Sequence, residues 1–179
     1  AAHVVASLGD KVDLVLDGGP CEQGLESTIV AMRGDGGWQL LRPGPIDRAR
    51  ISAILGPESD VTTAAGIEAP GQLASHYAPR TPLRLLESPR DFIPEHGKRY
   101  ALLSFRGDPD DGYVDLTDWA QVMILSPGNG KLPEAAVRFF YALRELDKCG
   151  ADEIIAEPLH EFGLGIAMMD RLRRAAAKM

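Results

Sequence analysis

The stretch from Ala69 to Pro82 constrains the fold most, because it carries three prolines within a short distance. Proline fixes its own φ and lacks a backbone N–H, so neither a helix nor a central strand can run through such a stretch. The sequence therefore predicts an extended, irregular segment in the middle of the chain. The patterns before and after it differ, which indicates two separately built halves.

The same stretch also carries side chains that a passive tether does not need. Leu73, His76, Tyr77 and Arg80 can stack, donate hydrogen bonds and bind anions, whereas flexible tethers are rich in glycine, serine or charge. Two interpretations follow from this composition. The segment is either a linker that docks on its own domains for stability, or a lid that covers a ligand.

The bulk composition excludes several classes of protein. The 179 residues are 45% hydrophobic and 25% charged, which is typical of a globular protein with one large or two small cores. A run of about 18 apolar residues and a secretion signal are both absent from the sequence, which predicts a cytoplasmic protein without a membrane span. A formal charge of -7 argues against a broad electrostatic surface for nucleic acid.

The cysteines and histidines predict no metal site. Cys21 and Cys149 are far apart in sequence, which favours reduced thiols over a disulfide framework. The four histidines are scattered and lack the spacing of a zinc site.

Short elements are predicted in the first half of the chain. In order they are a helix ending at Gly9, a buried strand at 12–16, strands at 26–32 and 38–42 that pair as a hairpin around the glycines of 34–37, and a helix at 46–55 between Asp47 as N-cap and Gly56. The chain starts inside a helical pattern and without an initiator methionine. We therefore expect the first domain to be incomplete.

After Pro82, short apolar runs alternate with helical patterns. The predicted strands are 83–86, 100–105, 122–125 and 153–156, and the predicted helices are 133–148 and 164–178. This alternation predicts an α/β fold with a parallel, doubly wound sheet.

Three polar residues of the first half are candidates for an anion or nucleotide site. Ser27 and Thr28 open a strand just after a glycine-bearing loop, and Arg42 ends the strand predicted to pair beside it. Two hydroxyls and a guanidinium could thus converge at one edge and hold a carboxylate or a phosphate. The alternative is that Ser27 and Thr28 are ordinary strand residues and Arg42 is a solvated turn residue.

Other patterns are assigned no ligand. The loop 126–131 resembles a phosphate-binding loop, but leucines stand at 125 and 132 where a glycine and a hydroxyl residue belong. His160 and Glu161 are expected to be structural. The last helix ends with cations that complement its dipole and that we interpret as a solvated helix end, namely Arg171, Arg173, Arg174 and Lys178.

Taken in order, several motifs resemble those of the threonylcarbamoyl-AMP synthase family in its long, two-domain form. They are D-G-G-P-C-E-Q-G-L-E-S-T-I-V at 17–30, L-L-R-P-G-P-I at 40–46, P-G-Q-L-A-S-H-Y-A-P at 70–79 and the closing G-L-G-I-A-M-M-D-R-L-R-R-A-A at 163–176. The resemblance implies the C-terminal part of a YrdC-like α/β twisted-sheet catalytic domain at 1–56, an interdomain linker or lid at 57–82, and a Rossmann-like parallel α/β domain at 83–179.

The resemblance also implies an activity and its site. The family condenses L-threonine, bicarbonate and ATP, with Mg²⁺ accompanying ATP, into threonylcarbamoyl-AMP and pyrophosphate. This is the first step toward threonylcarbamoyladenosine at position 37 of tRNA, and downstream transferase proteins later modify the RNA. Carried over by motif, Ser27 would contact threonine, Arg42 the ATP phosphates or AMP, and His76 and Tyr77 would fold over the nucleotide.

Some positions depart from the family pattern. Ala69 and Gln72 stand where the linker motif prefers serine and methionine, and Ala31 stands where an aspartate often follows S-T-I-V. The K-x-R and S-x-N motifs that hold the nucleotide and its triphosphate have no counterpart in the chain. We therefore expect the chain to be the C-terminal portion of the enzyme and inactive alone. A non-catalytic module that binds a regulatory nucleotide or a partner is the alternative.

Overall fold

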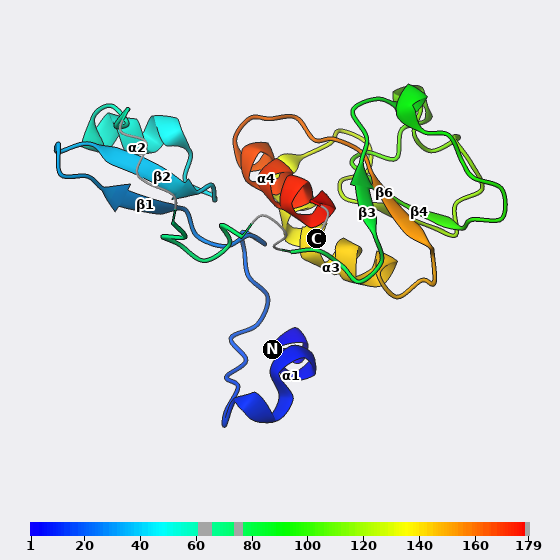
Figure 1. The fold of residues 1–179 in the computed structure, drawn as a ribbon, viewed down its shortest axis with the longest axis horizontal. Helices are drawn as coiled ribbons and strands as arrows, with labels where there is room; N and C mark the ends of the chain where they lie inside the picture. Colours follow the sequence, from blue (N-terminus) through cyan, green and yellow to red (C-terminus); the bar gives the residue numbers. More distant parts are fainter. Residues whose placement is uncertain (61–65, 74–76, 178–179) are drawn as a thin grey trace.

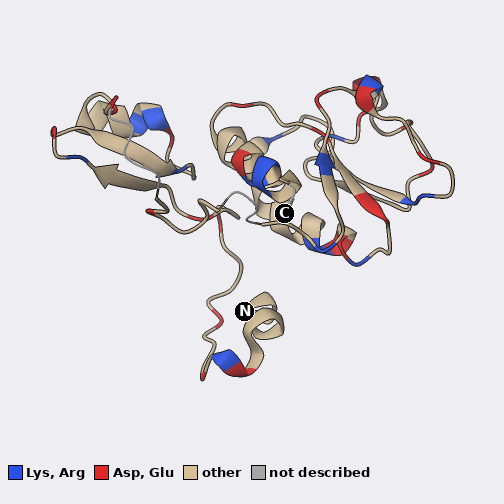
Figure 2. Cartoon of the chain, viewed as in Figure 1, with Lys and Arg blue, Asp and Glu red and all other residues tan. Residues whose placement is uncertain are grey.

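The computed structural model describes residues 1–60, 66–73 and 77–177 of the chain. We call residues 1–56 the first region and residues 83–177 the second region, and the linker joins them. Figure 1 shows the N-terminal helix of the first region apart from its hairpin. The elements of the first region are α1 (Ala2–Leu8), a 3₁₀ turn (Gly9–Lys11), β1 (Ile29–Met32), β2 (Trp38–Arg42) and α2 (Arg48–Leu55). Acidic and basic residues are interspersed over both regions (Figure 2). None of the described helices is long and apolar enough to cross a membrane.

The predicted hairpin is confirmed. β1 and β2 pair antiparallel, with Met32 opposite Trp38, and an irregular register follows Ile29. The turn closes because the Asp35 side chain accepts a hydrogen bond from the backbone N–H of Gly37 at 2.9 Å. The predicted cap of the next helix is also present, since Asp47 accepts a hydrogen bond from the N–H of Arg50 at 2.8 Å.

The buried strand predicted at 12–16 is wrong. These residues belong to no strand, and Leu14 and Leu16 are 75% and 84% exposed. A strand forms when neighbouring backbone satisfies its N–H and C=O groups, and no described strand pairs with this run. Figure 1 shows it as part of an extended segment that leads from α1 to the hairpin.

The second region contains a fully parallel sheet. Its elements are β3 (Leu83–Leu85), β4 (Tyr100–Ser104), β5 (Gln121–Ile124), α3 (Leu132–Leu146), β6 (Glu153–Ala156) and α4 (Leu164–Ala176), with 3₁₀ turns at Pro89–Asp91 and Pro109–Asp111. The strand order is β3-β6-β4-β5. The predicted parallel α/β sheet is therefore confirmed, with element ends that differ from the prediction by one or two residues.

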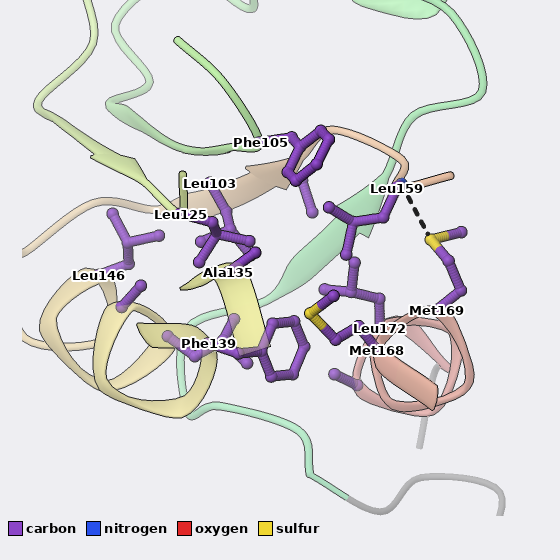
Figure 3. Close-up of a cluster of buried hydrophobic side chains, with 14 of the residues drawn as sticks. Leu103, Phe105, Leu125, Ala135, Phe139, Leu146, Leu159, Met168, Met169 and Leu172 are labelled. Atoms are coloured by element: carbon purple, nitrogen blue, oxygen red, sulfur yellow. Dashed lines mark hydrogen bonds between the residues drawn. The ribbon is translucent and has the colours of Figure 1, made fainter. Parts of the chain in front are cut away.

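The two helices lie on the same face of this sheet, so the expectation of a doubly wound sheet is wrong. Figure 3 shows the core between them, where Phe139 of α3 and Met168 of α4 lie beneath Leu103 of β4. Loops and 3₁₀ turns cover the other face, where Phe92 and Tyr113 pack on the strands. The connections from β3 to β4 and from β4 to β5 contain no α-helix to cover that face.

Candidate functional site

The hairpin brings Ser27 and Arg42 together, as the sequence predicted. Arg42 donates from Nε to the carbonyl of Ser27 at 3.1 Å and from Nη2 to the Ser27 hydroxyl at 3.3 Å. The antiparallel pairing causes this contact, because it places the end of β2 opposite the residues that precede β1. A hydroxyl and a guanidinium therefore occupy one edge of the first region.

Thr28 serves the backbone instead. Its hydroxyl donates to the carbonyl of Ile46 at 2.9 Å and accepts from the N–H of Ile46 at 3.0 Å. Gly44 allows this close approach, since a Cβ there would overlap the backbone N of Thr28 and come within 2.7 Å of the carbonyl of Glu26. The predicted convergence therefore holds for Ser27 and Arg42, while Thr28 fixes the turn beside them.

The linker docks on the hairpin through its first residues. Gln72 donates to the carbonyl of Leu41 at 3.2 Å and accepts from the N–H groups of Glu68 and Ala69 at 2.7 and 2.9 Å. The Glu68 carboxylate also pairs with Arg33 at 2.8 Å. This part of the linker is thus a docked segment, as one of the two interpretations required.

Tyr77 lies beside Arg42. Gly71, at φ +90°, makes this approach possible, because a Cβ there would come within 2.7 Å of the Tyr77 hydroxyl and 3.2 Å of Arg42 Cδ. Arg42 also reaches the linker backbone, donating to the carbonyl of Pro70 at 3.4 Å. His76, the other predicted lid residue, lies outside the described residues.

The conformation of Tyr77 is unusual. Tyr77 is the one described non-glycine residue with a positive φ, at 69°, a region that non-glycine residues rarely occupy. Its ring lies 5.7 Å from that of Phe140 and 5.6 Å from the guanidinium of Arg171. Burial and the charge of Glu26 raise the pKa of the Tyr77 hydroxyl, which therefore stays protonated at neutral pH. The surrounding residues hold this strained backbone in place.

The interpretation of Arg171 as a solvated cation is wrong. Arg171 is completely buried and donates from Nε and Nη2 to Glu26 Oε2 at 3.2 and 3.0 Å. From Nη1 it donates to the carbonyls of Pro43 at 2.6 Å and Ala167 at 3.2 Å. Burial opposes the negative charge of Glu26, but a hydrogen bond from its own backbone and the charge of Arg171 prevail and lower its pKa.

The helical spacing of the sequence could have predicted that Arg171 is buried, although its charge suggested exposure. Arg171 is three residues after Met168 and four before Ala175, so the three share one helix face, and both neighbours are buried. Helical position therefore predicts burial of Arg171 better than residue type does.

The other cations of the last helix differ in their contacts. Arg174 Nη1 donates to the carbonyls of Gln72 at 2.9 Å and Leu73 at 3.1 Å, so this side chain is also misassigned as solvated. Arg173 is half exposed and pairs with Glu161, as expected for a surface residue. Lys178 lies outside the described residues.

A cleft of about 720 Å³ adjoins the site. Its walls come from α1, the segment before β1, the linker and α3, and include Leu25, Glu26, Tyr77, Pro79 and Phe140. Glu26 and Tyr77 belong to both the cleft and the cluster around Arg171, whereas Ser27 and Arg42 do not line the cleft. The described residues contain no group of three or more His, Cys, Asp or Glu that could hold a metal ion.

A second buried carboxylate lies in the C-terminal region. Glu157 follows β6 and accepts hydrogen bonds from the Ser104 hydroxyl at 2.7 Å and the N–H of Phe105 at 3.0 Å. Burial outweighs these bonds and raises the pKa of Glu157. Glu157 thus joins the ends of β4 and β6 and has partners within its own region.

Comparisons with known proteins cover both regions. A family model described as "Threonylcarbamoyl-AMP synthase, C-terminal domain" matches residues 46–177, and one described as "Telomere recombination" matches residues 1–44. The chain is 30% identical over 194 residues to the threonylcarbamoyl-AMP synthase of Pyrococcus abyssi, covering 98% of this chain and 53% of that protein. It is 32% identical over 188 residues to that of Bacillus subtilis, covering 98% and 52%.

Two solved structures are also similar. One is a crystal structure of P. abyssi Sua5 complexed with L-threonine, with a TM-score of 0.70, 30% identity and coverage of 98% of this chain and 53% of that one. The other is a P. abyssi Sua5 variant in which a histidine and the following tyrosine are both replaced by alanine, with a TM-score of 0.74, 29% identity and coverage of 98% and 52%. The chain spans about half the length of the relatives it matches.

Proposed function

The chain belongs to the threonylcarbamoyl-AMP synthase family, and we propose that it supplies part of the site in which such an enzyme joins L-threonine, bicarbonate and ATP. The products are threonylcarbamoyl-AMP and pyrophosphate. The proposal places this step in the cytoplasm, upstream of the transferase proteins that modify tRNA. The observation that carries it is the convergence of Ser27, Arg42 and Tyr77 from three separate segments.

Arg42 has the donors that a phosphate contact requires. A guanidinium carries five N–H groups in a planar fork. Three of them point to Ser27 and to the carbonyl of Pro70, which leaves two for an oxyanion. The Ser27 hydroxyl beside it can orient the carboxylate of threonine while Arg42 binds phosphate oxygens.

Magnesium would accompany ATP, bound to its phosphate oxygens and neutralising part of their charge. The described residues supply no carboxylate cluster for a resident ion. The roles we assign to the residues of this chain are to orient the substrates and to exclude water.

Water exclusion is the role we assign to the linker. A carbamate and a mixed carbonic-phosphoric anhydride both decompose in water, so their synthesis benefits from a covered site. Tyr77 lies next to Arg42 in a strained conformation that neighbouring groups maintain. A relative has been studied with a consecutive histidine and tyrosine replaced, and in this chain that pair occurs only at 76 and 77. His76 is assigned to the lid with Tyr77.

Replacing Tyr77 with alanine tests the lid in the complete enzyme. We expect threonylcarbamoyl-AMP formation to fall while the thermal midpoint changes little. Tyr141→Ala is the matched control, because Tyr141 lies on α3 and is 53% exposed. Full activity and unchanged ATP affinity in Tyr77→Ala would reject the lid interpretation and favour the interpretation of a linker docked for stability.

Arg42→Lys and Ser27→Ala test the substrate contacts. Lysine cannot reproduce a bidentate contact, so we expect Arg42→Lys to weaken ATP or AMP binding by about 1 to 3 kcal/mol. Ser27→Ala should instead weaken threonine binding. Titration calorimetry measures both affinities, with the exposed Arg50→Lys as control. Unaltered affinities in both site variants would place the site elsewhere.

The 179 residues alone should not catalyse the reaction. A site that orients three substrates needs further donors for the nucleotide and its triphosphate, and orientation and electrostatic stabilisation each contribute several kcal/mol to such a barrier. We expect the purified chain to release no pyrophosphate from ATP, threonine and bicarbonate. Release at a rate near that of a complete synthase would refute this.

A further inference from the structure

Outside its own helix, Arg171 bonds to the sequence neighbours of both proposed substrate residues, Ser27 and Arg42. Its two bonds to Glu26 hold the residue that precedes Ser27, and its bond to the carbonyl of Pro43 holds the residue that follows Arg42. The bond to Pro43 is short, at 2.6 Å, and all these groups lie against a guanidinium that is 0% exposed. One side chain of α4 therefore bonds to the Glu26 side chain next to Ser27 and to the Pro43 backbone next to Arg42.

The same helix also holds the linker at two points. The guanidinium of Arg171 lies over the ring of Tyr77 at 5.6 Å, a distance suited to cation–π attraction. One turn along, Arg174 donates to two consecutive linker carbonyls, those of Gln72 and Leu73. These contacts lie on either side of the three residues that the structure leaves undescribed.

Stability alone does not account for a buried arginine at this place. Desolvating a guanidinium opposes folding, and an apolar side chain of similar volume often stabilises an interface as well as a buried ion pair does. An arginine adds directed donors, and four of its hydrogen bonds are aimed at groups in defined positions. Its contribution is geometric specificity.

We propose that Arg171 and Arg174 are positioning residues, through which α4 of the C-terminal domain holds Tyr77 and the linker against the substrate residues. The inference rests on the proposed function for the identity of the ligands. It assigns a role in the site to the closing motif at 163–176, for which the sequence alone predicted no function.

A double-mutant cycle in the complete synthase tests Arg171. We expect Arg171→Met to lower kcat/KM for ATP at least about tenfold, since bonds from a charged donor are lost. Arg171 contacts Tyr77 as well as Glu26 and Pro43, so part of this loss acts through Tyr77, and the same substitution in a Tyr77→Ala background should lower kcat/KM by a smaller factor. Arg173→Met is the control, as Arg173 pairs with Glu161 on the surface and forms no hydrogen bond or ion pair with a site residue among the described contacts. Equal losses in both backgrounds, or no loss, would overturn the proposal.

Arg174→Met is the second variant, and it tests the positioning role even if Arg171→Met fails to fold. Its side chain is 24% exposed, and its loss removes bonds to the linker and to Asp170 only among the described contacts. We expect amide exchange in residues 66–73 of the 179-residue chain to accelerate at least about tenfold, with exchange in β4 unchanged. Unchanged linker exchange would overturn the proposal.

The exchange measurement needs no substrate, so it separates the two proposals. If the wild-type enzyme makes no threonylcarbamoyl-AMP, the proposed function fails, and linker exchange alone decides whether α4 positions the linker. If the enzyme is active and linker exchange is unchanged in Arg174→Met, the function stands and the positioning role fails.

Discussion

The two regions differ in how they are held together. From Leu83 onward, two helices pack on one sheet face, and loops close the other over a second apolar cluster. Within residues 1–56, all of which the structure describes, the fully apolar interior is limited to Trp38 and Ile51. Large apolar side chains of that region, among them Val5, Leu14 and Leu16, are instead exposed. One region is held by its own core and the other by its contacts with the linker and α4.

The region that is stabilised by its own core is therefore not the region that carries the proposed substrate residues. The region with the core contains none of the predicted substrate residues, whereas Ser27 and Arg42 lie in the region with the thin core. A site built on such a region needs external support to keep its geometry, and the buried bonds of Arg171 provide it.

Cutting the chain gives the largest expected effect. We expect residues 83–179 to fold alone with a cooperative thermal transition, because their two apolar clusters lie within this segment. Residues 1–56 alone should show no cooperative transition by circular dichroism. A cooperative transition in the isolated 1–56 segment would remove the distinction between the regions.

Core substitutions should act differently in the two regions. Phe139→Ala should lower the free energy of unfolding of the C-terminal region by about 3 to 5 kcal/mol, since Phe139 is completely buried. Trp38→Ala should loosen the hairpin and leave that transition in place. The chain's two tryptophans, Trp38 and Trp119, lie in different regions, so single-tryptophan variants report each transition by fluorescence. Loss of the Trp119 transition in Trp38→Ala would show one cooperative unit.

A smaller effect is expected at Gly44. An added Cβ overlaps the backbone of Thr28, so Gly44→Ala should destabilise the hairpin by about 1 to 3 kcal/mol and weaken threonine binding through Ser27. Gly97→Ala is the control for glycine substitution, because a Cβ there meets no atom within 4 Å and its positive φ gives a backbone penalty alone. Calorimetry with threonine should show no change in the control.

The smallest effect is a pH dependence of opposite sign in the two regions. The pKa of Glu26 is lowered, so its contribution to stability is complete above its ordinary value of 4.5 and is lost as the pH falls toward the folded value. The pKa of Glu157 is raised, so stability of the C-terminal region declines as the pH rises through 4.5 toward the folded value.

Urea titrations from below pH 3 to pH 7, followed by each tryptophan, measure both dependences. Glu26→Gln should flatten the Trp38 profile, and Glu157→Gln should flatten that of Trp119. If either variant changed the Trp38 and Trp119 stability profiles together, the two regions would not unfold independently.

Local signals predicted much of this structure. Asp35 with its glycines set the hairpin turn, Asp47 and Gly56 bounded α2, and the hairpin then required Ser27 and Arg42 to meet. The predictions that were wrong concerned features that depend on residues far away in the sequence. The run at 12–16 is apolar enough for a buried strand, but no local pattern says whether a neighbouring strand is present to pair with it.

The sheet and the last helix show the same limit. Periodicity in α3 and α4 gives the buried face of each helix but not the side of the sheet that it covers. The charge of Arg171 favours solvent, and its burial becomes favourable only because Glu26 and Pro43, far away in sequence, supply acceptors. The ligand roles of Ser27, Arg42, His76 and Tyr77 rest on resemblance and stay predictions.

The contact between Arg171 and Glu26 also has a consequence for the order of assembly during synthesis. The two residues are 145 positions apart, so at a translation rate of about 5 to 20 residues per second roughly 7 to 29 seconds pass between them. Throughout that interval the hairpin has been made but lacks the helix that anchors it. The hairpin therefore takes its final place only after α4 has been made, and until then the Glu26 carboxylate lacks its guanidinium partner.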